Sequence, residues 1–457
     1  MQLSFWGAAG TVTGSKYLLT LNQKKILIDC GLFQGEKTIR DRNWEPLPIS
    51  PAEIDAVILT HAHLDHSGYL PVIVKNGFTG PIYSTPGTKE LSAILLADSG
   101  KIQEEDAYFA NKHGYTKHTP ALPLYTQEEA LKTMKLFYTV PFEQVFRLFE
   151  GDTSNECRVT FSRAAHILGS AFIQIEHQGK TIVFSGDLGR AHDPIMREPS
   201  FMGQADYVVI ESTYGDRLHD PEPPHKMLAQ VINETASRGG TVLIPAFAVG
   251  RAQSIINYLA ELKENSEIPS LPIYLDSPMA ESVTDIYTRH LEEHCLDKDQ
   301  CRKLNADVIY VKTIEESKRL DASAYPSIII SASGMATGGR VLHHLKALAP
   351  NPRNTILFTG YQAKGTLGRH LLEGDQEVKI HGKNVEVRAA VKVLDNLSAH
   401  SDYAETLTWL GHLKQPPRQV FITHGELESS LALKQKIEEK FGWPCLVPTH
   451  LQNVKID

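Results

Sequence analysis

The strongest constraint on this chain is a cluster of histidine and aspartate side chains that directly follows a short apolar run. Residues 56–59 read Ala-Val-Ile-Leu, which predicts a buried strand. The next few positions hold His61, His63, Asp65 and His66. Imidazole nitrogens and carboxylate oxygens are ligands that Zn²⁺ accepts. The cluster is therefore expected in the loop at the carboxyl end of a strand, where α/β proteins often place their sites.

The spacing divides this cluster into two pairs. His61 and His63 are two positions apart, so in an extended segment they face the same way. Asp65 and His66 follow too closely to join them easily on one ion. We therefore expect one pair for each of two metal ions. The alternative is a solvated loop that is merely rich in histidine, which the further candidate ligands downstream disfavour.

Polar side chains also follow other apolar strand segments. Asp29, Asp187 and Glu211 each come directly after such a run, and His166 lies between a strand and a turn of small residues. A carboxylate at the end of a buried strand is costly unless it is paired. Asp29 is expected to orient a metal-bound histidine, or else to cap the turn that follows it. Asp187 has two oxygens and can bridge two cations. The repeated placement argues for one shared catalytic edge.

Two more histidines follow strand-like segments near the end of the chain. His400 comes shortly after the strand-like segment 391–394, and His424 follows the strand-like segment 419–422. A lone histidine at a strand end is usually structural. Two in succession, after the earlier set, predict a return of the chain to the metal site.

Composition bounds the class of protein. The chain has 457 residues, of which 42% are hydrophobic and 22% charged, as in an ordinary globular protein. No apolar run is long enough to predict a membrane-spanning helix, and the first residues do not resemble a secretory signal. Five scattered cysteines without a CxxC pair suit a reducing compartment, so we expect a cytoplasmic protein. The net charge of −8 counts against broad non-specific affinity for nucleic acid, but not against a local basic groove.

The middle of the chain predicts a second α/β unit. Between residues 214 and 394, apolar strand segments at 242–244, 273–275, 328–330 and 356–358 alternate with helical stretches. That alternation is typical of a parallel sheet with crossover helices. Upstream, residues 88–150 are expected to be largely helical.

Two loops of this second unit suit phosphate groups. Residues 331–340 and 358–369 each follow a buried strand and offer backbone N–H groups, hydroxyls and an arginine near a predicted helix start. The alternative is an ordinary connection between strand and helix. The candidate phosphate-binding residues are Ser333, Gly334, Met335, Gln362, Gly365 and Thr366.

The ordered set from Asp29 through the HxHxDH element to His166 and Asp187 resembles the metallo-β-lactamase superfamily. Glu211, His400 and His424 resemble the A, B and C motifs of its β-CASP group of nucleases. The resemblance spans nearly the whole chain and is close to the bacterial and archaeal relatives of the endonuclease subunit of cleavage and polyadenylation factor. It implies an α/β fold: an αββα sandwich from residues 1–213 and 395–457, with an α/β β-CASP domain containing a parallel sheet inserted at 214–394.

The resemblance also implies a function. It implies a zinc-dependent ribonuclease that binds two Zn²⁺ per chain and cleaves RNA endonucleolytically, with 5′-exonuclease activity as a further mode. One ion would be held by His61, His63 and His166, and the other by Asp65, His66 and His424. Asp187 would bridge them, and hydroxide activated by both ions would attack phosphorus. His400, positioned by Glu211, would protonate the departing 3′-oxygen, and Asp29 and Asp65 complete the catalytic set.

Three other readings stay open. A DNA-directed β-CASP nuclease is the nearest, although a histidine at the third marker, His424, favours RNA. A metallo-hydrolase of small esters or thioesters shares the HxHxDH element, but the inserted domain argues against a small substrate. A non-catalytic RNA-binding scaffold would have lost ligands that are present here. The acidic net charge leaves open a protein partner that supplies specificity. The oligomeric state, including a homodimer, is open as well.

Overall fold

The computed structural model describes residues 1–114, 118–277, 279–323 and 325–456. These residues form two compact units. Unit 1 combines Met1–Leu218 with His400–Asp457, and unit 2 is His219–Ala399. The sequence-based limits were 213 and 395, so each break in the structure lies five residues further along the chain.

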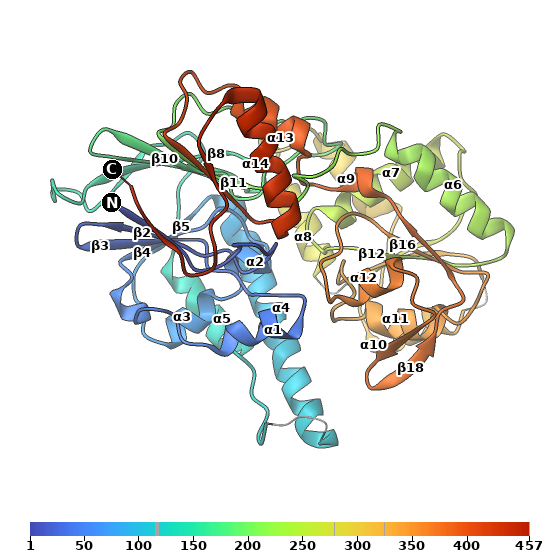
Figure 1. Ribbon diagram of the computed structural model, residues 1–457. Helices are drawn as coiled ribbons and strands as arrows, with labels where there is room; N and C mark the ends of the chain where they lie inside the picture. The colour runs from blue at the N-terminus through green and yellow to red at the C-terminus, as the bar shows by residue number, and fades with distance from the viewer. Residues whose placement is uncertain (115–117, 278, 324, 457) are drawn as a thin grey trace. The chain divides into compact units, whose positions relative to one another are not determined.

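Unit 1 is built on two sheets, each seven-stranded in the part of the chain that the structure describes. The first has the order β22-β1-β2-β3-β4-β5-β6 and the second β21-β20-β11-β10-β9-β8-β7. The strands of the first sheet are β1 (Gln2–Phe5), β2 (Tyr17–Leu21), β3 (Lys24–Ile28), β4 (Ala56–Ile58), β5 (Ile82–Ser84), β6 (Phe137–Thr139) and β22 (Asn453–Lys455). Those of the second are β7 (Phe146–Leu148), β8 (Cys157–Arg163), β9 (Ala171–His177), β10 (Lys180–Phe184), β11 (Tyr207–Glu211), β20 (Gln419–Thr423) and β21 (Cys445–Leu446). The two ends of the chain meet where β1 pairs with β22 (Figure 1).

Alternating side chains give unit 1 three buried layers. Between the sheets, Phe5, Phe161, Phe184 and Phe421 belong to one apolar cluster. The outer face of the first sheet packs against helices of the N-terminal half, and the outer face of the second packs against α13 and α14. The result is an αββα sandwich (Figure 1). The helices of unit 1 are α1 (Lys37–Arg40), α2 (Leu64–Ser67), α3 (Leu70–Lys75), α4 (Pro86–His113), α5 (Gln127–Thr133), α13 (Tyr403–Leu410) and α14 (Leu427–Phe441), with short 3₁₀ helices at Asp41–Trp44, Pro51–Glu53 and Met134–Leu136.

Strand register brings the polar strand ends together. The parallel pair β3 and β4 aligns Ile28 with Ile58, so Asp29 emerges beside the loop that carries the histidine cluster. The parallel pair β11 and β20 aligns Glu211 with Thr423, immediately before His424. This alignment is the shared edge that the sequence pattern predicts.

Unit 2 contains a parallel sheet with the strand order β14-β13-β15-β12-β16-β19 in its described residues, which confirms the expected sheet. Its strands are β12 (Val242–Pro245), β13 (Ile273–Asp276), β14 (Ile309–Tyr310), β15 (Ile328–Ser331), β16 (Thr355–Phe358) and β19 (Ala390–Val393), and β17 (Glu377–Ile380) and β18 (Lys383–Glu386) form a separate hairpin. Helices α11 and α12 pack on one face of the sheet together with that hairpin. The helices of unit 2 are α6 (Pro224–Ser237), α7 (Arg251–Glu264), α8 (Ala280–Tyr287), α9 (Lys298–Ala306), α10 (Ile314–Asp321), α11 (Val341–Leu348) and α12 (Leu367–Leu372), with a 3₁₀ helix at Asp395–Leu397.

One sequence-based expectation is wrong in part. Residues 88–150 are helical in α4 and α5, but Phe137–Thr139 and Phe146–Leu148 are the edge strands β6 and β7. Both strands have only three residues. Alternation of apolar and polar residues over three positions cannot be distinguished from the helical pattern that precedes it. Among the described residues, the structure has no helix that is both long and apolar enough to cross a membrane.

Candidate metal centre

The histidine cluster lies where the sequence pattern places it, in the loop and short helix after β4. His61 and His66 are fully buried, and α2 begins directly after His63. The backbone carbonyl of His63 accepts hydrogen bonds from the amides of His66 and Ser67. This turn directs side chains from both halves of the motif toward one centre.

Asp187 is the carboxylate at that centre. Its Oδ2 lies 3.4 Å from His61 Nε2 and 3.5 Å from His166 Nε2. Its Oδ1 lies 3.1 Å from His66 Nε2 and 3.5 Å from His424 Nδ1. Oδ2 therefore faces one pair of imidazoles and Oδ1 faces another pair, as expected of a carboxylate that bridges two ions.

The predicted ligands fall into two groups. Ligand atoms of His61, His63, His166 and Asp187 lie within 4.8 Å of one another. The second group, with the same spacing, is Asp65, His66 and His424. Every sequence-predicted metal ligand therefore lies in one of the two groups, and all belong to unit 1.

Electrostatics keep the first group ready to bind a cation. Burial lowers the pKa of His61 to about 3 and that of His63 to about 4. Burial also holds the pKa of His166 well below its usual range. The carboxyl pKa of Asp187 is well below its ordinary value, because the surrounding imidazoles outweigh its burial. The neutral imidazoles of His61, His63 and His166 and the ionised carboxylate of Asp187 are the protonation states that metal binding requires.

The donor set fits metal ions. His63 Nδ1 lies 3.1 Å from His166 Nε2, and His66 Nε2 lies 3.1 Å from His424 Nε2. Buried His61 Nε2 has no hydrogen-bond partner in the part of the chain that the structure describes. A buried nitrogen without a hydrogen-bond partner is costly. A cation held by His61 Nε2 and the facing nitrogens would remove that cost, so the donor set fits a metal ion.

Asp29 supports His66. Its Oδ2 lies 2.7 Å from His66 Nδ1, and its Oδ1 accepts the backbone amide of Thr60 at 2.8 Å. Asp29 is completely buried and has a φ of 57°, a conformation that a non-glycine residue adopts only when its surroundings hold it. Of the two sequence interpretations, the geometry matches orientation of a histidine.

His400 and Glu211 form a pair beside the metal ligands. His400 Nδ1 lies 3.1 Å from both carboxylate oxygens of Glu211. Glu211 is 2% exposed, and its Oε1 also accepts the backbone amide of Leu188 at 2.6 Å. Burial disfavours protonation of His400, but Glu211 and Asp187 outweigh it and raise its pKa to about 8.

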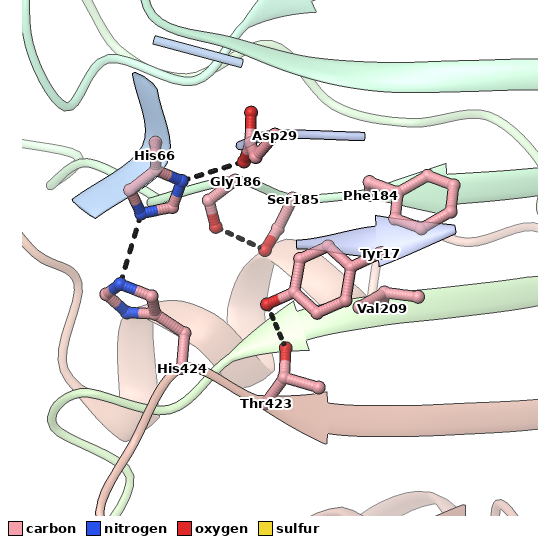
Figure 2. Close-up of a pocket in the computed structure, with 9 residues that line it drawn as sticks. All are labelled: Tyr17, Asp29, His66, Phe184, Ser185, Gly186, Val209, Thr423 and His424. Atoms are coloured by element: carbon pink, nitrogen blue, oxygen red, sulfur yellow. Dashed lines mark hydrogen bonds and ion pairs between the residues drawn. The ribbon is translucent and has the colours of Figure 1, made fainter. Parts of the chain in front are cut away.

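His424 enters from the far end of the sequence. It follows β20 with a φ of 49°, and its backbone amide donates to the Ala8 carbonyl at 2.7 Å. His424 also lines a small pocket, together with Tyr17, Asp29 and His66 among others (Figure 2). In Figure 2 the His424 ring points toward His66, and the Tyr17 hydroxyl donates to Thr423 Oγ1 at 3.0 Å.

Three hydroxyl residues at the centre were not singled out from the sequence. Thr60 contacts Asp29, Ser15 contacts His66, and Thr213 contacts His424. The sequence could have indicated two of them only by their nearness to predicted site residues, because Thr60 directly precedes His61 and Thr213 follows Glu211 by two positions. Threonine and serine are too common for adjacency alone to identify them.

The candidate phosphate loops pack against each other in unit 2. Gln362 Nε2 donates to the Gly334 carbonyl at 3.2 Å, and Thr366 Oγ1 caps α12. Met335, Gln362 and Thr366 are buried, whereas Ser333 is half-buried and Gly365 is exposed. Their buried side chains serve contacts within the loops, so phosphate binding by this set stays a prediction.

An αββα sandwich with two such ligand groups at one sheet edge defines a metallo-hydrolase. Family models match the metallo-β-lactamase superfamily at residues 9–231, the β-CASP domain at 252–371 and a Zn-dependent metallo-hydrolase RNA specificity domain at 384–448. The chain is 38% identical to ribonuclease TTHA0252 of Thermus thermophilus over 95% of both chains. It therefore belongs to the β-CASP group of the metallo-β-lactamase superfamily and is a metal-dependent hydrolase.

Further relatives agree with this assignment, and one solved structure shares the fold. The transcription termination factor FttA of Methanosarcina mazei is 33% identical over 98% of this chain and 71% of its own length. FttA of Methanocaldococcus jannaschii is 31% identical over 100% of this chain and 72% of its own. A crystal structure of a protein of unknown function from Enterococcus faecalis superposes with a TM-score of 0.54 at 13% identity, covering 99% of both chains. That likeness supports the fold alone.

Proposed function

We propose that this protein is a zinc-dependent ribonuclease that binds two Zn²⁺ and hydrolyses RNA phosphodiester bonds, endonucleolytically and with a 5′-exonuclease mode. The observation that carries the proposal is the pair of half-buried His400 and buried Glu211 directly beside the two ligand groups. A metal site of this superfamily serves many hydrolyses, whereas this pair adds a proton donor for a leaving group. The ribonuclease among the relatives and the matched RNA specificity domain support RNA as the substrate.

The proposed ligand roles follow the two groups. His61, His63 and His166 would hold one ion, Asp65, His66 and His424 the other, and Asp187 would contact both. Two zinc ions, when bound, would lower the pKa of a water molecule and offset charge on the phosphoryl oxygens. Asp29 would hold the ring of His66 in place through its Nδ1.

His400 would act as the general acid. Glu211 contacts Nδ1 of His400, so Nε2 is the ring nitrogen that would face the substrate. A proton there would pass to the departing 3′-oxygen. Help of this kind is commonly worth about 10²–10⁴-fold in rate.

The proposal has two further parts. The half-buried Ser333 and the exposed Gly365 would contribute polar groups to phosphate binding by the two loops of unit 2. All five cysteines are free thiols in the described residues, which supports a reducing compartment such as the cytoplasm.

The test is cleavage of end-labelled RNA by the zinc-loaded protein, beside a DNA of the same sequence. His400→Ala should keep its zinc and cleave about 10²–10⁴-fold more slowly. His412→Ala changes an exposed histidine of unit 1 and should cleave like the wild type.

Each product pattern decides one part of the proposal. A ladder of internal fragments supports endonuclease activity. Release of mononucleotides alone would show that the protein is an exonuclease instead. Equal cleavage of DNA would favour the DNA-directed alternative. Full activity of His400→Ala would remove His400 from the mechanism.

A further inference from the structure

Two buried threonines contact the candidate metal ligands: Thr213 contacts His424 of the second group, and Thr60 contacts His61 of the first group at 3.1 Å and His66 of the second at 3.5 Å. Thr60 precedes His61 and is completely buried, and Thr213 lies near His424 and is 3% exposed. Each hydroxyl contacts the Nδ1 atom of a histidine and also a second atom that can only accept a hydrogen bond. Because the second atom must accept the hydroxyl proton, it determines which ring nitrogen of each histidine carries the imidazole proton.

At the second ligand group, the protons follow from the geometry of Thr213. Its Oγ1 lies 3.2 Å from the backbone carbonyl oxygen of His424 and 3.2 Å from His424 Nδ1. A carbonyl only accepts, so the hydroxyl donates its proton there. The hydroxyl then offers only lone pairs to Nδ1, which must carry the imidazole proton. The lone pair of neutral His424 is therefore on Nε2, which faces Asp65 Oδ2 at 3.4 Å.

At the first ligand group, the Thr60 hydroxyl also contacts one acceptor and one histidine Nδ1. Its Oγ1 donates to the carboxylate of Asp29 at 2.9 Å and lies 3.1 Å from His61 Nδ1. The Asp29 carboxylate accepts, so His61 Nδ1 must donate to the hydroxyl. The lone pair of His61 is then on Nε2, which faces Asp187 Oδ2 at 3.4 Å.

We propose that Thr60 and Thr213 are positioning residues that fix the tautomer and ring orientation of His61 and His424, respectively. The proposal rests on the ligand roles in the proposed function. Groups that hold the second nitrogen of a metal-bound histidine typically contribute 10–100-fold to metal affinity. Neither hydroxyl touches the substrate or the reacting atoms in this account, so their effect is on the metal ions.

The test measures zinc binding rather than activity. Metal-free wild type, Thr213→Val, Thr213→Ser, Thr60→Val and Thr60→Ser are titrated with Zn²⁺ in competition with a chromogenic chelator. Thr213→Val should weaken one of two dissociation constants by about 10–100-fold and leave the other unchanged. Thr60→Val should weaken at least the constant of the ion held by His61 by a similar factor, because its hydroxyl also contacts Asp29 and His66. Each serine variant keeps the hydroxyl and should bind both ions like the wild type. The Thr60→Val/Thr213→Val double variant should weaken both constants, because the two hydroxyls together contact histidines of both groups.

Folding is controlled separately. Far-ultraviolet circular dichroism and the melting temperature of each metal-free variant should match the wild type. Thr213→Ala and Thr60→Ala serve as second variants, because they remove the hydroxyl without placing a methyl group in its position. In Zn²⁺-loaded protein with ¹⁵N-labelled histidine, the His424 resonances should show a protonated Nδ1, and Thr213→Val should change them.

The outcomes separate this inference from the proposed function. Wild-type affinity for both ions in the valine and alanine variants would overturn the inference and leave the two-metal proposal intact. Serine variants as weak as the valine variants would also overturn it, because shape rather than the hydroxyl would then decide. A wild type that binds fewer than two zinc ions would overturn the two-metal proposal and this inference with it.

Discussion

At the scale of residues, His344 shows how one buried imidazole can depend on two carboxylates. Its Nε2 lies 2.8 Å from Asp276 Oδ2 and its Nδ1 lies 2.6 Å from Asp321 Oδ1. Burial disfavours its charge, but the hydrogen bonds to both aspartates outweigh burial and raise its pKa to about 9. His344 is therefore a cation at neutral pH that connects β13, α10 and α11.

This pKa predicts how the stability of unit 2 depends on pH. An unfolded histidine titrates near 6.5, so the stabilisation is complete below that pH and is lost as pH rises through about 9. The free energy of unfolding should fall by about 2–3 kcal/mol between these limits. Urea unfolding of the whole chain at pH 6.5 and pH 9.5 measures it. His344→Gln should flatten the change, and His370→Gln, at an exposed histidine, should not. A slope that His344→Gln leaves intact would contradict the assignment.

Residue identities in the metal centre were largely predictable, and their supports were not. His61, His63 and Asp187 follow apolar runs, so strand ends could be located from the sequence and their polar side chains recognised. Thr213 gains its importance only when His424, far along the chain, lies 3.2 Å away. His344 could not be singled out for the same reason, because its partners Asp276 and Asp321 are remote in sequence.

At the scale of elements, one hydrogen bond joins the two sheets of unit 1. Tyr17 in β2 donates to Thr423 in β20, and both side chains are buried (Figure 2). The bond anchors the strand end that carries His424. The ring of Tyr17 also packs near Phe184 of the second sheet, 6.1 Å between centroids.

Tyr17→Phe should therefore lower the stability of unit 1. It removes one buried neutral hydrogen bond while the ring keeps its packing, so the expected loss is about 1 kcal/mol. The melting temperature of the metal-free protein measures it. Tyr138→Phe is the matched control, because Tyr138 is 57% exposed and its change should be within about 0.5 kcal/mol. Equal melting temperatures for the two variants would show that the Tyr17 hydroxyl contributes nothing.

Strands and helices could be predicted where the hydrophobic pattern extended over enough residues to be recognised. The strands before Asp29, His61 and Glu211 are continuous apolar runs, and the alternation of strands and helices in unit 2 gave its parallel sheet. The edge strands β6 and β7 were missed because three residues carry almost no period, and two of the three residues of β6, Tyr138 and Thr139, are exposed. Their pairing with β5 and β8 supplies the order that local sequence lacks.

At the scale of the whole molecule, the two ends of the chain build one site. Asp65 and His66 lie near the start, whereas His400 and His424 come after the whole of unit 2. Unit 1 closes through the parallel pairing of β11 with β20, which no local pattern could have predicted. The order of motifs along the chain could be recognised only as a family resemblance, which the family models and relatives confirm.

The most direct test of the two-metal account is a titration of metal-free protein with Zn²⁺ while RNA cleavage is followed. All proposed ligands lie in unit 1, in two groups that share Asp187. The account predicts that cleavage rises to its maximum only as the second equivalent binds, and that Asp187→Ala binds less zinc and stays inactive at two equivalents. Full cleavage at one equivalent, or an Asp187→Ala protein that still holds two zinc ions and cleaves RNA, would contradict it.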